Sequence, residues 1–195
     1  MAGISSSAIF RQFIADQLAG NVGGTTNVNF VSLNSGTAAF YKVALYGIAS
    51  NAQTATPSKD STSLASGDST NYGAATSAWA TGAGANAASA SQPEVYNTGW
   101  AQGGVALGTP TVTTPATAVI MFDAVDTAST ATTTLTNVYG SLIYVASSAA
   151  NTAAATTTTL NNRGVCYNYF GGANGVTAGT LTVVWNNSGI FRITV

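Results

Sequence analysis

The chain has 195 residues, a length that suits one domain and leaves little room for two. Charged residues make up 6% of it, against about a quarter in typical soluble domains, and the formal net charge is -1. Its five basic residues are scattered, which excludes the basic patch of a protein that binds nucleic acid or an anionic membrane. A net charge near zero favours association, so we expect a homo-oligomer.

The N-terminal stretch from Ser5 to Ala19 has the pattern of an amphipathic helix. Serines stand at the expected N-cap, Gly20 follows the last turn, and apolar residues recur at spacings of three and four, at Phe10, Phe13, Ile14 and Leu18. Such a stripe is buried either across an end of the chain's own sandwich or against a partner. We predict that residues 1–20 are an anchor that contacts a partner, with Val22 to Gly24 as its hinge.

Residues 21–195 are predicted to form a single β domain. Asn27 to Leu33 and Phe40 to Gly47 suit a hairpin, and the second strand has apolar residues on both faces. Residues 48–92 then form a low-complexity polar excursion of Ala, Ser, Thr, Gly and Asn that cannot build a core of its own. Either this excursion makes lateral contacts with a partner, which we favour, or it is a solvated insertion.

The second half of the chain alternates strand-like runs with turn signals. Thr111 to Thr114 and Thr117 to Ala124 are predicted strands, and Val119 to Phe122 within them is expected to be a central core strand. Further strands are expected at Thr130 to Leu135, Asn137 to Val145 and, with period two, at Val165 to Tyr169, Leu181 to Trp185 and Ile190 to Val195. Turns are expected at Gly171 to Gly175 and at Asn186 to Gly189. This pattern predicts a mainly β fold, an antiparallel β-sandwich or jelly roll with one N-terminal helix and a long polar insertion.

The composition offers little for catalysis. Histidine is absent, which removes the commonest general base and metal ligand. The single cysteine, Cys166, alternates with apolar neighbours and is expected to be a small buried residue. Asp123 and Asp126 are the only carboxylates close in sequence; a calcium loop or a glycosidase pair is conceivable, but a turn capped by Asp is favoured. We expect that the protein is not an enzyme and that it binds no cofactor or metal.

Aromatic residues raise a carbohydrate-binding alternative, because sugars stack on aromatic faces. Trp185 alternates with Leu181 and Val183, which favours core packing, whereas Trp79 lies in the most polar context of the three tryptophans. The first twenty residues lack the pattern of a secretory signal, so we expect the chain to be made and folded in a cytoplasm.

An ordered set of short motifs resembles small virion structural proteins of tailed bacteriophages. The resemblance spans Tyr41 to Val195 apart from the polar excursion, and its motifs are Lys42 to Tyr46, Glu94-Val95, Thr98 to Leu107, the apolar strand with Phe122-Asp123, Gly140 to Tyr144 and Gly179 to Val183. The resemblance implies a β-sandwich subunit without catalytic or metal residues.

From the resemblance we expect a head decoration or cement protein on the virion surface. Its partners would be the major capsid protein and copies of itself, in a homotrimer because capsid lattices offer three-fold sites. The alternative is a tail or fibre adhesin that binds a host glycan through its polar loops and Trp79. The predicted partner-contact residues are Phe10, Phe13, Ile14, Leu18 and Trp79.

Overall fold

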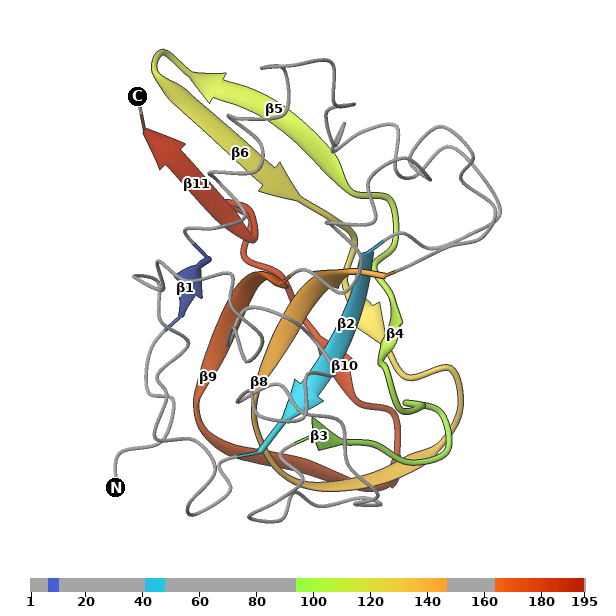
Figure 1. Ribbon diagram of the computed structural model, residues 1–195. Helices are drawn as coiled ribbons and strands as arrows, with labels where there is room; N and C mark the ends of the chain where they lie inside the picture. The colour runs from blue at the N-terminus through green and yellow to red at the C-terminus, as the bar shows by residue number, and fades with distance from the viewer. Residues whose placement is uncertain (1–6, 11–40, 48–93, 147–163, 195) are drawn as a thin grey trace, which may run out of the picture.

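The computed structural model describes residues 7–10, 41–47, 94–146 and 164–194, which form an antiparallel, mainly β fold without a helix (Figure 1). The mainly β class expected from the sequence is therefore confirmed for this part of the chain. The strands are β1 (Ala8–Ile9), β2 (Tyr41–Tyr46), β3 (Glu94–Val95), β4 (Val105–Ala106), β5 (Thr111–Ala116), β6 (Val119–Asp123), β7 (Thr127–Ala128), β8 (Thr133–Val145), β9 (Gly164–Gly179), β10 (Thr182–Val183) and β11 (Phe191–Thr194).

The largest unit is a six-stranded sheet in the order β1-β9-β8-β2-β3, with β4 also paired to β2. Its two long strands, β8 and β9, curl over strongly along their length (Figure 1). The pairing of β8 with β9 is interrupted by several register shifts, and Asn137 and Gly171 have positive φ angles of 56° and 80°. Such irregularities bend a strand and increase its twist, so they account for the curl.

Strand β2 lies inside this sheet, which explains why both faces of the strand carry apolar residues. It pairs with β8 along its whole length on one edge and with β3 and β4 on the other. Five of its six residues are buried, Lys42 being the exception. The sequence expectation that both faces of this strand are covered is confirmed.

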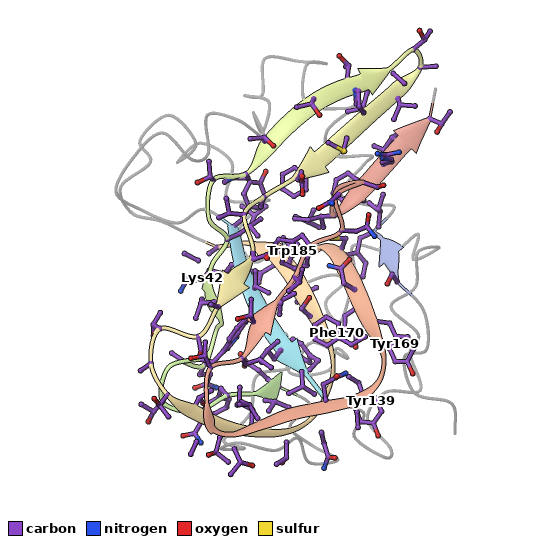
Figure 2. All side chains as sticks on the ribbon, turned by 180° about the vertical axis from the view of Figure 1, so that it is seen from behind. Lys42, Tyr139, Tyr169, Phe170 and Trp185 are labelled. Carbon is purple, nitrogen blue, oxygen red and sulfur yellow. The ribbon has the colours of Figure 1, made fainter. Side chains whose placement is uncertain are left out.

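A two-stranded ribbon of β7 and β10 adds to the same hydrophobic core. Trp185, just after β10, is buried, its indole N–H donates to Thr127 Oγ1 at 3.2 Å, and its backbone N–H donates to Asp126 Oδ1 at 2.9 Å. Figure 2 shows the Trp185 ring at the centre of the molecule. Core packing of Trp185, as its alternation with Val183 indicates, is confirmed.

The third unit, which we call the projecting sheet, consists of β5, β6 and β11 in the order β11-β6-β5 and stands away from the curled sheet (Figure 1). The turn at Asn186 to Gly189 that precedes β11 is present as expected: Gly189 N–H donates to Asn186 O at 2.7 Å. The expected central core strand is central in this sheet but not in the core. Of β6 only Phe122 is buried, because the outer part of the sheet extends beyond the core.

The expected N-terminal helix is wrong where the structure describes it. Residues 7–10 are extended, and Ala8 and Ile9 pair with Tyr167 and Cys166 at the edge of β9. Phe10 N–H donates to Val165 O at 3.0 Å. A short helix is marginal without tertiary support, and here the free edge of β9 offers these residues a ladder of hydrogen bonds instead. The rest of Ser5 to Ala19 lies outside the described residues, as do residues 48–92 and the first strand of the expected N-terminal hairpin.

Two further predictions, a turn and a break between two strands in the second half of the chain, are also wrong. Gly171 to Gly175 is no turn: β9 continues through it, with Asn174 paired to Val138 of β8. The expected strands at Thr130 to Leu135 and Asn137 to Val145 are one strand, β8, bent at Asn137. In both places the pairing of β8 with β9 continues past the local turn signal, which becomes a bend within a strand.

The loop from Asn97 to Gly104 is fixed by close backbone contacts, which yields a stability prediction. Gly104 has φ +79°, and a Cβ there would overlap the Val43 carbonyl of β2. Gly104→Ala should therefore lower the free energy of unfolding by at least about 2 kcal/mol, from backbone strain and the overlap together. Denaturant unfolding measures this change. Gly172→Ala is the control, because its Cβ would meet nothing within 4 Å; an equal loss in both variants would contradict the argument.

Candidate interaction site

A buried polar network fixes the loop before β4 to the curled sheet. Glu94 is fully buried and its Oε1 accepts a 2.7 Å hydrogen bond from Gly103 N–H, while Tyr144 OH donates to Gly103 O at 2.6 Å. Trp100 is also fully buried, and its indole N–H donates to Val43 O at 3.1 Å. Each group has a structural partner, so the network holds β3, β4 and β8 against β2.

A row of aromatic rings joins the core to the projecting sheet. The rings of Tyr41 and Phe122 meet edge to face at 5.6 Å, and those of Phe122 and Phe191 are stacked at 5.1 Å. Tyr41 is on β2, Phe122 on β6 and Phe191 on β11, so the row runs from the curled sheet into two neighbouring strands of the projecting sheet. Aromatic pairs of this kind stabilise by about 1 kcal/mol beyond the area they bury, so the projecting sheet is held firmly at its base.

The projecting sheet has one apolar face. Phe191 is paired with Phe122 and Ile193 with Ile120, and Val112 is opposite Phe122, so all five side chains share a face. Burial falls along this face: Phe122 is 1% exposed at the base, whereas Ile120 is 37% exposed. The opposite face carries Met121, Arg192 and threonines. The apolar face thus continues beyond the core that anchors it.

A groove lies where the projecting sheet meets the edge of the curled sheet. It is a cavity of about 210 Å³ lined by residues of β1, β9 and the start of β11, among them Ile9, Tyr167 and Phe191. Figure 1 shows β1 beside β9 and below β11. Because β1 and β11 are the outer strands of their sheets, the groove is flanked by two sheet edges.

A second, smaller groove lies inside the curl of β9. It has a volume of about 160 Å³ and is lined by Phe170, Asn174 and residues 181–184. Figure 2 shows Phe170 on the inner side of β9 and Tyr169 on the outer side, as the alternation of a strand requires. Val184 at this groove is 70% exposed. An aromatic ring beside an amide and a hydroxyl is a combination that can hold a small polar ligand.

Of the partner-contact residues expected from the sequence, only Phe10 falls within the described residues. Phe10 is fully buried in the chain's own hydrophobic core, next to β9. Phe13, Ile14, Leu18 and Trp79 lie outside the described residues. The exposed apolar residues Ile120, Val125 and Val184 were not expected. One feature of the sequence could have indicated that Ile120 is exposed: the neighbouring strand β5 is rich in threonine, which is unusual for a strand beside a core strand.

The described residues hold no group of three or more Asp, Glu, Cys or His side chains that could bind a metal ion. Cys166 is buried, as expected, and burial raises the pKa of its thiol to about 12, although Asn168 donates a weak hydrogen bond to the sulfur. Both close carboxylates accept backbone N–H bonds, Asp123 from Ala124 and Asp126 from Trp185. The Asp123 bond is local and fits a capped strand end, whereas the Asp126 bond is long-range and ties the chain before β7 to Trp185.

No protein-family model, no curated protein and no solved structure matches this chain. Within the described ranges no helix is long and apolar enough to cross a membrane.

Three buried tyrosines predict loss of stability in alkali. Burial raises the pKa of Tyr41, Tyr144 and Tyr167 well above the usual value of about 10, and the charge of Glu94 adds to the rise at Tyr144. Above about pH 10 the unfolded chain loses these protons while the folded chain keeps them, so stability is unaffected below that pH and falls above it, by up to about 1.4 kcal/mol per tyrosine and pH unit.

Denaturant unfolding between about pH 8 and 12, together with tyrosinate absorbance, measures this loss. Tyr144→Phe should lower stability by about 1 kcal/mol at neutral pH, since Gly103 O loses its donor, and should make the alkaline decline shallower. Titration of all eight tyrosines while the far-UV circular dichroism stays native would contradict the prediction.

Proposed function

We propose that this chain is a structural protein of a tailed-bacteriophage virion, a decoration or cement protein that binds the major capsid protein on the head surface. The observation that supports this most is the projecting sheet. It is anchored by stacked aromatic rings and then extends an apolar face, with Ile120 37% exposed, beyond the core. An apolar face built on a rigid support and left outside the core is typical of a protein-contact element.

The composition supports the same proposal. A surface of threonine, serine, asparagine and glycine with 6% charged residues has few charges to desolvate when a large area is covered by a neighbour. The buried Glu94 network and the close packing of Gly104 make the body a rigid platform rather than a deformable one. Copies of the chain are its second proposed partner, with three-fold symmetry suggested by capsid lattices.

The proposal extends to the finer architecture. We propose that the curled sheet and the β7–β10 ribbon are opposing layers of an antiparallel β-sandwich or jelly roll. The burial of Val183 on β10, and of Trp185 just after it, in one core with β2, β8 and β9 supports this layering.

Purified virions test the function directly. Mass spectrometry should find the chain in many copies per particle, and cryo-electron microscopy should show it on the outer head surface. Heads assembled without it should bind the purified chain saturably and withstand more heat afterwards. Ile120→Asp should weaken this binding at least about tenfold by placing a charge on the apolar face, whereas Thr177→Asp on the exposed end of β9 should not. A chain found only in lysates and never in virions would overturn the proposal.

The alternative, an adhesin of the tail or fibre, has one observation in its favour. The groove beside Phe170 combines an aromatic ring with Asn174 and Thr182, which suits a sugar. In that case a glycan array should show saturable binding, and Phe170→Ala should reduce it at least about tenfold through loss of stacking. Tyr139→Ala, on the outer side of the curl in Figure 2, is the matched control. An array without saturable binding would remove this alternative.

A further inference from the structure

The two outer strands of the projecting sheet differ in how their edges are protected. Strand β5 follows Pro110, contains Pro115, and has a register shift between Thr113 and Ala116. Prolines and bulges are the devices that keep a sheet edge from pairing with another chain. Strand β11 has neither: its four residues, Phe-Arg-Ile-Thr, pair with β6 in unbroken register. Within the described part of the chain no strand pairs with the outer edge of β11.

The one charged residue of β11 does not block this edge. Arg192 Nε donates to Ser188 O at 2.6 Å, and its guanidinium also contacts Met121 Sδ at 3.7 Å. Since Arg192 is opposite Met121 in the ladder, both side chains lie on the polar face of the projecting sheet. The guanidinium is therefore held over the chain's own β6 and Ser188.

We propose that β11 pairs antiparallel with β11 of a second copy of this chain, so that the two projecting sheets become one continuous sheet across a two-fold axis. The proposed axis passes at Ile193. Ile193 then faces Ile193 of the second copy, and Arg192 faces Thr194 on either side. An axis at Arg192 would put two arginines directly opposite each other, which is unfavourable.

A second copy fits this edge better than a charged foreign partner. The three strands of the projecting sheet carry only two charged side chains, Asp123 and Arg192, and the whole chain has a formal net charge of -1, so two copies repel each other little. An identical strand matches β11 in length and in its alternation of apolar and polar residues. Pairing also makes the apolar faces of the two copies continuous through the two Ile193 side chains.

The inference rests on the self-association in the proposed function, but it is independent of a place in the virion. The two-fold contact would join two subunits whether or not each also belongs to a three-fold ring. Both tests below use the purified chain alone. A negative result in them would therefore not contradict the place in the virion, and a negative virion experiment would not contradict the β11 contact.

Disulfide trapping tests the axis. Residues directly opposite in an antiparallel pair have Cα atoms roughly 4.5–5.5 Å apart, which is within the range a disulfide spans. Under mild oxidation Ile193→Cys should form at least about tenfold more linked dimer than Thr113→Cys on the protected edge, because pairing raises the local thiol concentration. The native Cys166 is buried, so the parent chain should give no disulfide-linked dimer under the same oxidation.

Charge reversal provides the independent test. Ile193→Asp and Ile193→Lys should each sediment at half the mass of the parent assembly or less, since each puts two like charges at the axis. An equimolar mixture of the two should recover the parent mass, because opposite charges then meet. Thr113→Asp should leave the mass unchanged. Circular dichroism of each variant verifies that it is folded.

Three results would overturn the proposal. The first is equal trapping of Ile193→Cys and Thr113→Cys. The second is preferential linkage between these two variants when mixed, which would indicate head-to-tail pairing of β11 with β5. The third is a monomeric parent chain, or folded charge variants that keep the parent mass.

Discussion

The antiparallel pairing of β8 with β9 is the constraint on which the rest of the described structure depends. β9 carries β1 on its far edge, and β8 carries β2, which in turn carries β3 and β4. The register shifts between the two long strands make the sheet curl, and within the curl lie the buried side chains of Val183 on β10 and of Trp185 just after it. The projecting sheet depends on the same pair indirectly, because Tyr41, whose ring meets Phe122, is held on β2 by β8.

The elements that could be predicted from sequence are those decided locally. The strands at Thr111 to Thr114 and Val119 to Phe122 and the turn at Asn186 to Gly189 carry their signals in adjacent residues, and all three are present. Elements decided by a distant partner could not be predicted. Gly171 to Gly175 has the composition of a turn, yet β8 holds it in a strand. Ala8 and Ile9 fall within the stretch with a helical pattern, and it is the edge of β9, far along the chain, that makes them a strand.

The candidate site was harder to predict than the fold, because exposure depends on what covers a strand rather than on the strand's own residues. Val119 to Phe122 reads as a buried central strand, and it is central; but its neighbours β5 and β11 stand outside the core, so Ile120 is exposed while Phe122 is not. Phe10 illustrates the converse. Its side chain was predicted to be buried against a partner. It is buried, but in the chain's own core. Periodicity therefore locates apolar faces without identifying the surface that covers them.

The unequal protection of the two sheet edges has a consequence for how assembly ends. If both β5 and β11 were open, each copy could pair head to tail with the next, and such contacts either close into a ring or grow without limit. Pro115 and the register shift in β5 disfavour pairing on that edge, so of the two edges of the projecting sheet β11 is the open one. In the proposed two-fold pair the open edge of each projecting sheet is used, and neither projecting sheet offers a second open edge to a third copy. A chain with so few charges has little electrostatic repulsion to keep it from aggregating, so confining the open edge of the projecting sheet to one short strand would keep the proposed association specific and finite.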